Sequence, residues 1–244
     1  MKDLIRSEIR KLSTTRTPYA MLLGATAMII LGVVGTVHDA SIAQLSVPLH
    51  QQMFLGVVRF VMPVFPLALG IRMFTEEFRH GSIVPTLLAS PDRRQVLMAK
   101  VAVMVGVAMV FVAASVAVAT GLGWALVSAK GVAITVAVAP LLAEIGRILV
   151  VTVLWSAIGV GVGLVVKHQV AAAVGTLLWL FVGENLVGAL STGIARYLPV
   201  HAAYGVFGGE VGMLAPMAAG IVLTAWTAVA LGAGAVVMER RDIA

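Results

Sequence analysis

Long uninterrupted apolar runs are the feature that most constrains this chain. The first extends from Pro18 to Val37 without a charged residue, and comparable runs recur to the end of the sequence. A run of about 20 apolar residues is what an α-helix needs to cross the hydrocarbon core of a bilayer. With 11% charged residues, the chain lacks the charged shell of a soluble domain, where roughly 25% is usual. We therefore predict an all-α, polytopic membrane protein.

Six membrane spans are predicted, forming a single transmembrane domain over residues 1–244. Their approximate ranges are 18–37, 53–74, 101–124, 142–166, 170–190 and 214–238. The second should bend at Pro63 and Pro66, because proline removes a backbone donor and clashes with the preceding turn. The fourth follows an outer segment that ends near Pro140. It carries Gly159 and Gly163 at a spacing that permits close contact between helices of one subunit.

Two segments outside the spans also have a helical pattern. Residues 2–16 place apolar side chains on one stripe and basic ones elsewhere, which is typical of a helix lying in the headgroup region. A frayed basic tail is the alternative. Residues 191–213 are too polar and glycine-rich to span, so we expect short extracellular or re-entrant helices there, between the fifth and sixth spans.

Lysine and arginine are distributed very unevenly between the two sides of this arrangement. Twelve fall on the side of the termini and two, Lys130 and Arg196, on the other. Because basic residues are retained in the cytoplasm, we predict that both termini are cytoplasmic. The formal net charge of +6 then reflects topology and attraction to anionic lipid headgroups, and no nucleic-acid partner is needed to explain it.

A few polar residues lie within or near the spans. Arg59, Glu144, Arg147, Glu184 and Asn185 all fall toward the outer side. A charge near the bilayer centre costs roughly 2.5–3.5 kcal/mol or more, so such residues are functional candidates. They form a candidate polar pathway or gate, and snorkelling to the interface is the alternative reading.

The sequence argues against several kinds of catalysis. A P-loop needs a glycine before its lysine, and none of the five lysines has one. Glu76-Glu77 is similar to the glutamate pair of intramembrane CAAX-type proteases, but Gly81 stands where those have arginine. Cysteine is absent, which removes thiolate chemistry. We expect a non-catalytic chain that binds no cofactor or metal of its own.

The hydrophilic segment "EEFRHGSIVPTLLASPDRR", residues 76–94, gathers three acids and three arginines between two apolar spans. Gly81 is placed to end the second span in the left-handed conformation, and Ser82 to cap a short helix that contains Pro85. Ser90 and Pro91 then form a predicted N-cap and first residue of the next helix. The segment therefore reads as a short cytoplasmic helix between two helix ends, with Arg93, Arg94 and Lys100 anchoring the third span at the headgroups.

The order of these features resembles the permease subunit of type-2 ABC exporters. Such permeases combine a basic amphipathic N-terminal helix, a second span running into E-x-x-x-G-S/T, a short helix, S-P-x-x-R, a lysine and a terminal R-R-D. The matching residues are Glu77, Gly81, Ser82, Ser90, Pro91, Arg94, Lys100, Arg240, Arg241 and Asp242. The motifs are short, and their order along the whole chain carries the resemblance.

The resemblance implies a division of labour. Two copies of a separate ABC ATP-binding subunit would hold ATP and Mg²⁺ and dock on the cytoplasmic side, facing a pair of permeases, identical or paralogous, in a bacterial-type cytoplasmic membrane. The coupling residues would be Glu76, Glu77, Arg79, Gly81, Ser82, Pro85, Ser90, Pro91, Arg93 and Arg94. The scarcity of charge in the spans favours a lipophilic or amphipathic cargo such as a drug or a lipid. The resemblance implies export, with import as the alternative. A proton-coupled secondary transporter and a membrane scaffold or assembly factor are the alternatives.

Overall fold

The computed structural model describes residues 1–48, 50–82, 85, 88, 92–135, 137–166, 168–208 and 212–240. All regular secondary structure in these ranges is helical. The elements are α1 (Lys2–Thr14), α2 (Thr17–Asp39), α3 (Ile42–Leu45), the 3-10 turn η1 (His50–Gln52), α4 (Leu55–Val61), α5 (Val64–Arg79), α7 (Arg93–Ala129), α8 (Val138–Val165), α9 (Gln169–Leu178), the π-helical η2 (Trp179–Gly183), α10 (Glu184–Leu190), α11 (Thr192–Ala195), α12 (Pro199–Phe207) and α13 (Pro216–Arg240).

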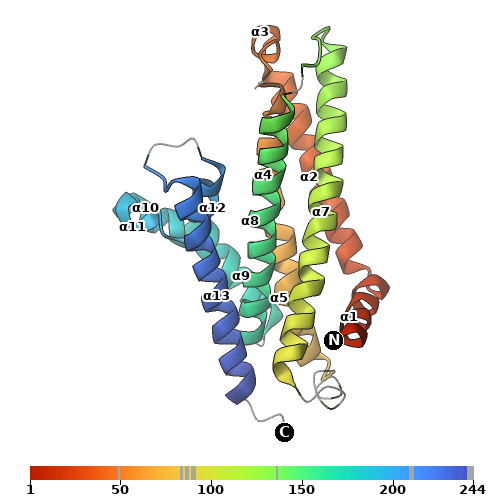
Figure 1. Ribbon diagram of the computed structural model, residues 1–244, viewed down its shortest axis with the longest axis vertical. Coiled ribbons are helices and arrows are strands. Elements are labelled where there is room, and N and C mark those ends of the chain that lie inside the picture. Colours follow the sequence, from red (N-terminus) through yellow and green to blue (C-terminus); the bar gives the residue numbers. More distant parts are fainter. Residues whose placement is uncertain are drawn as a thin grey trace.

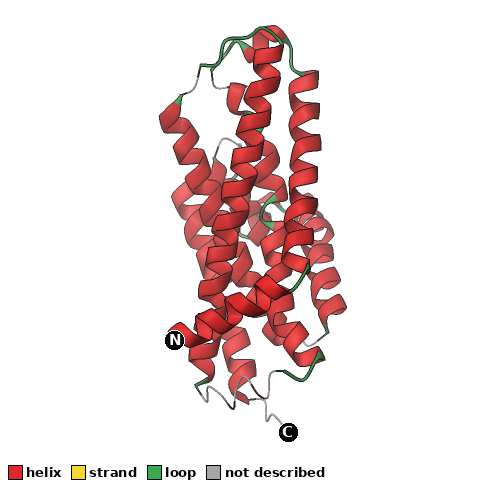
Figure 2. Ribbon diagram, turned by 90° about the vertical axis from the view of Figure 1, so that its right-hand side faces the viewer, coloured by secondary structure: helices red, strands yellow, loops and turns green. Residues whose placement is uncertain are grey.

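Six segments of the described chain are long and apolar enough to cross a membrane, as predicted. They are Thr17–Asp39, His50–Arg79, Arg93–Ala129, Val138–Val165, Gln169–Leu190 and Pro216–Arg240. Figure 1 shows an elongated bundle with α1 and the last turns of α13 at the same end. In Figure 2 the helix that begins at the N-terminus lies obliquely across that end of the bundle. We call it the α1 end.

Helix α8 is the centre of the bundle because its glycines allow two neighbours to approach closely. It packs against α5 on one side and α13 on another. A Cβ atom added to Gly159 or Gly163 would lie under 3.0 Å from a backbone carbonyl of α5, and one added to Gly161 would meet the backbone of α13. The G-x-x-x-G pair therefore packs helices within the subunit, as predicted.

The second span is broken into α4 and α5, with Pro63 as N-cap of α5, because proline disrupts the preceding turn, as predicted. The starts of the third and fourth spans differ from the expected ones. The third begins at Arg93, where the carboxylate of Asp92 accepts hydrogen bonds from the Arg94 and Gln95 amides. The predicted N-cap at Ser90 was therefore wrong. Helix α8 begins at Val138, so Pro140 lies in its first turn, where proline is tolerated.

The fifth span is interrupted by the π-helical segment η2 between α9 and α10. Such segments are rare and frequently mark functional sites. After α10, the region predicted to hold short helices does hold α11 and α12. Helix α11 packs against α10, and α12 packs back on the bundle against α13 and α8.

Candidate functional site: a buried charged cluster and an opposite polar cavity

Four charged side chains from three helices meet at the α1 end of the bundle. We call Glu8, Lys11, Glu77 and Lys100 the α1-end cluster. Lys100 Nζ donates to Glu8 Oε2 at 2.7 Å and to Glu77 Oε1 at 2.8 Å. Lys11 Nζ donates to Glu8 Oε1 and Glu77 Oε1, both at 2.7 Å. Two carboxylates and two ammonium groups thus link α1, α5 and α7 with no net charge.

Burial makes this cluster different from a surface ion pair. Lys100 is 0% exposed, Glu8 3% and Glu77 6%, and the Lys100 ammonium also lies 4.9 Å from the centre of the Phe74 ring. Buried charges are costly unless they are paired and hydrogen-bonded. The prediction that Lys100 anchors the third span at the headgroups was wrong, because the two carboxylates hold its side chain inside the bundle.

The electrostatics of the α1 residues follow from this pairing. Burial alone would raise the pKa of Glu8, but Lys100 and Lys11 outweigh it and lower that pKa below its usual value. Burial would likewise lower the pKa of Lys11, but Glu77 and Glu8 outweigh it and raise that pKa. Both groups are therefore held in their charged forms.

A small cavity of about 170 Å³ adjoins the cluster between α1 and the end of α5. It is lined in part by Glu76, His80 and Ser82. The second oxygen of Glu77 is buried and has no hydrogen-bond partner within the described ranges. A cavity of this size has room for water, which would satisfy that oxygen.

The predicted coupling segment starts where α5 ends. Gly81 follows the C-cap residue and has φ 66°, the left-handed conformation expected for a helix stop. Arg79 and Gly81 are exposed, while Glu76 pairs with Arg72 one turn earlier on α5. The end of α5 therefore combines the buried carboxylate of Glu77 with an exposed surface at Arg79 and Gly81.

The other end of the same segment is tied to the last helix. Arg93 donates to the Met238 and Glu239 carbonyls, and Arg94 Nε donates to Glu239 Oε1 at 3.0 Å. Pro85 is helical and exposed. Ser90, Pro91 and most of the predicted short helix lie outside the described residues. The described residues on either side of this segment are thus tied to other helices, Glu77 to α1 and Arg93 and Arg94 to α13.

The candidate polar pathway residues divide into two groups near the opposite end. Arg59 on α4 pairs with Glu144 on α8, and Arg147 lies 3.7 Å from the same carboxylate. The ring of Phe207 covers the Arg59 guanidinium at 4.9 Å, and the Phe207 carbonyl accepts from Arg147 at 3.1 Å. Glu144 and Arg147 are three residues apart on one helix, so their contact is local. Sequence reasoning missed the contact of Arg59 with Glu144, because nothing in the spacing shows that α4 and α8 are neighbours.

Glu184 and Asn185 follow the π-helical segment and face different surroundings. Glu184 is 0% exposed, and its carboxylate accepts the Val200 amide at 2.8 Å and lies 3.5 Å from His201 Nδ1. Asn185 and Arg59 line one cavity of about 420 Å³ bounded by α4, α5, α8, η2, α10 and α12. We call it the polar cavity. Sequence reasoning missed His201, a lone histidine in a glycine-rich segment.

These features define the class of protein. It is a multi-pass helical membrane protein with a buried charged cluster at one end and, near the other, a cavity lined in part by Arg59. A family model described as "ABC-2 family transporter protein" matches residues 4–183. Because the match covers most of the chain, the protein belongs to this family, as the sequence motifs predicted. No curated protein matches the chain. It is therefore a multi-pass ABC-2 permease, and members of this family are typically non-catalytic membrane subunits.

Proposed function

We propose that this permease moves cargo in response to ATP hydrolysis on a separate subunit. Two copies of an ABC ATP-binding subunit would hold ATP and Mg²⁺ and dock at the α1 end, which is the cytoplasmic end in this proposal. Two permeases, identical or paralogous, would line the path in a bacterial-type cytoplasmic membrane. Family membership supports this, and the observation that carries it is that the helix ends flanking residues 82–92 are joined to α1 through Glu77 and to α13 through Arg93 and Arg94.

These contacts between helix ends supply a route for mechanical coupling. A push on the segment after Gly81 acts directly on the end of α5, which the α1-end cluster joins to α1 and α7. The same push acts on the start of α7, which Arg93 and Arg94 join to α13. Because α5 and α13 both pack closely on α8, movement at either end of the segment would also displace α8 at the centre of the bundle.

The cargo is proposed to be lipophilic or amphipathic and to be exported. The polar cavity supports this choice, because its described lining is largely apolar and aromatic with Arg59 and His201 as charged or titratable members. Such a surface suits a molecule with a large apolar body and a few polar groups.

The test is reconstitution with a Walker A-containing ATP-binding subunit that co-purifies with the permease. Glu77→Gln and Arg94→Gln should each abolish cargo-stimulated ATP hydrolysis and transport, while membrane insertion and complex formation persist. Arg94 is mainly exposed, so its variant tests coupling without threatening the fold. Lys2→Gln, at an exposed position on α1, is the control and should transport normally. Unchanged transport by both Glu77→Gln and Arg94→Gln would refute the coupling assignment.

A further inference from the structure

Two adjoining cavities near the end of the bundle opposite α1 contain charge, and the charge in their described lining is positive. The polar cavity contains Arg59, and a neighbouring cavity of about 480 Å³ contains Arg196. Asn185 and His201 line both cavities, so the two spaces meet at these side chains. None of the described residues that line either cavity is an acid. We call the second space the Arg196 cavity.

The acids of this region lie behind the cavity walls. The side chain of Arg59 is 36% exposed, whereas that of its partner Glu144 is 10% exposed. The side chain of His201 is 17% exposed, whereas that of Glu184 is fully buried. A molecule in the polar cavity would therefore meet the guanidinium group and the imidazole ring of these two pairs, and not their carboxylates.

The charge of Arg59 is only partly neutralised by its described surroundings. Glu144 lies beside two arginines, Arg59 and Arg147, so these three side chains together carry a net charge of +1. Glu144 accepts from the Nε atom of Arg59, and no described residue accepts from the two terminal nitrogens of that arginine. Because charge inside a membrane protein is costly unless it is paired, an anion beside Arg59 would be stabilised.

The remainder of the polar cavity is suited to a flat apolar molecule. Its volume of about 420 Å³ is within the roughly 300–1,000 Å³ usual for small-molecule sites. Five aromatic side chains line it, namely Phe60, Trp155, Phe181, Tyr204 and Phe207. The rings of Phe60 and Tyr204 have their centres 5.5 Å apart. Such rings favour stacked or edge-to-face contacts with another flat ring.

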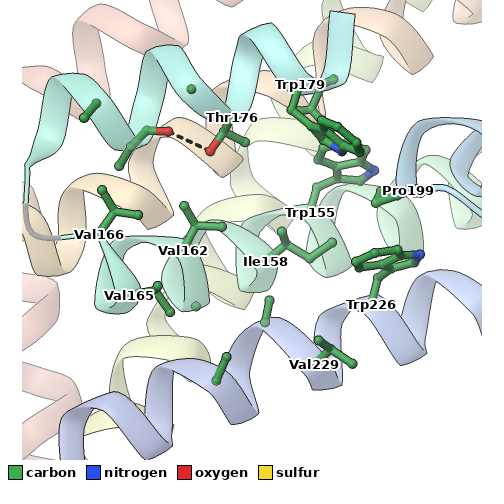
Figure 3. A pocket seen from close by; sticks show the side chains of 17 residues that line it. Trp155, Ile158, Val162, Val165, Val166, Thr176, Trp179, Pro199, Trp226 and Val229 are labelled. Carbon is green, nitrogen blue, oxygen red and sulfur yellow. Dashed lines mark hydrogen bonds between the residues drawn. The ribbon is translucent and has the colours of Figure 1, made fainter. Parts of the chain in front are cut away.

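A third cavity, between α8, α9 and α13, offers a comparison without charge. Its volume is also about 420 Å³, and none of its described lining residues is charged. Trp155, Trp179 and Trp226 line it, and Figure 3 shows these side chains gathered at the end where Pro199 lies. An uncharged apolar molecule would fit this apolar cavity as well as the polar one. An anion finds a counter-charge only in the polar cavity and the Arg196 cavity.

We propose that the polar cavity binds a small anionic molecule with a flat apolar body. Arg59 holds the anionic group, because a guanidinium group pairs well with carboxylate, phosphate and similar anions, and the body lies against the aromatic side chains. Arg196 adds positive charge from the adjoining cavity. This narrows the amphipathic cargo of the proposed function, on which its description as cargo rests. Binding itself is measured without the ATP-binding subunit.

The probes are anilinonaphthalene sulfonate and its parent phenylnaphthylamine, which differ by one sulfonate group and fluoresce strongly in apolar surroundings. Each is titrated into the full chain in phosphatidylcholine nanodiscs, and the signal of empty nanodiscs is subtracted. We expect saturable binding of the sulfonate, and in Arg59→Gln the sulfonate should bind about ten- to hundredfold more weakly while the parent binds as before. Equal affinity of the wild-type chain for both probes would refute the role of the anionic group.

Arg147→Gln is the matched control. It removes the same charge from beside the same carboxylate, but Arg147 is not among the described residues that line the polar cavity. Its affinity for the sulfonate should stay within about threefold of the wild type. Equal losses of affinity in Arg59→Gln and Arg147→Gln would overturn the assignment of Arg59.

Glu144→Gln guards against loss of fold because a gain is expected. Removing the carboxylate leaves Arg59 without its acidic partner, so the sulfonate should bind about three- to tenfold more tightly. A misfolded chain would not show this gain. Weaker binding of the sulfonate by Glu144→Gln would contradict the proposal.

Two competitors identify what the site requires. Inorganic sulfate has no apolar body and should leave the probe bound, so displacement of the probe by equimolar sulfate would refute the role of the aromatic side chains. Nanodiscs that contain phosphatidylglycerol, studied in high salt to screen their surface charge, should also leave the probe bound. Loss of binding there would show an anionic phospholipid as the occupant and would overturn the assignment to a small molecule.

The outcome is separable from that of the proposed function. A chain that prefers the sulfonate but supports no ATP-driven transport would refute the proposed function alone. A chain that transports but binds both probes equally would refute this inference alone.

Discussion

The α1-end cluster makes a quantitative prediction about Lys100. Replacing it by methionine keeps the length of the side chain but leaves Glu8 and Glu77 facing Lys11 alone, whose side chain is 44% exposed. Removal of one partner from a buried ion pair typically costs 3–5 kcal/mol, because the remaining charge is left uncompensated. Lys100 contacts two carboxylates at 2.7 and 2.8 Å, so we expect Lys100→Met to lower the free energy of unfolding by about 3–5 kcal/mol.

The matched comparison is a double-mutant cycle. Lys100→Met with Glu77→Gln removes one charge of each sign and leaves the pair of Glu8 and Lys11, so the double variant should recover about 1–3 kcal/mol relative to the sum of the single changes. Arg94→Met, on the same helix but in an exposed ion pair, should cost at most about 1 kcal/mol.

Unfolding would be followed by tryptophan fluorescence in detergent, and release of α1 by hydrogen exchange of its backbone amides. Faster exchange in α1, with the centre of α8 unchanged, is expected for Lys100→Met. If Lys100→Met unfolds within about 0.5 kcal/mol of the wild type, or if the cycle shows no coupling with Glu77, the cluster does not hold α1 to the bundle.

Three further predictions concern pH, packing and topology. The pKa of Glu8 is lowered and that of Lys11 is raised, so docking of α1 should be constant between about pH 5 and 10. It should weaken as pH falls through the lowered pKa of Glu8, and weaken again as pH rises through the raised pKa of Lys11. Hydrogen exchange of the α1 amides that changes steeply near pH 7 would contradict this. Gly159→Ala should destabilise the protein by about 1–3 kcal/mol, because its Cβ would meet the Leu67 carbonyl, whereas Gly175→Ala should be neutral or stabilise by up to about 1 kcal/mol; equal melting temperatures for the two variants would contradict the packing of α8. In this cysteine-free chain, Ser7→Cys should react with an impermeant maleimide only from the cytoplasm and Ser128→Cys only from outside, and the reverse pattern would invert the topology.

Much of the architecture is readable from local signals. The length of the apolar runs is set by bilayer thickness, so the six spans could be predicted, and the break before Pro63 follows from the missing backbone donor of proline. Gly81 adopts the conformation that its position after "EEFRH" indicates. The order of short motifs indicated the family that the comparison with known proteins then showed.

The partners of the charged residues depend on tertiary structure. The sequence contains Glu8, Glu77 and Lys100, but Lys100 is 92 positions from Glu8 and 23 positions from Glu77. Nothing in these separations indicates that the three side chains are in contact. The same holds for Arg59 with Glu144, and for three tryptophans on three helices that line one cavity. Apolar length and turn chemistry act between neighbours in the chain, whereas pairing of buried charges and shaping of cavities depend on which helix faces meet. In this bundle, the glycines of α8 decide two of those pairings, because they let α5 and α13 approach closely.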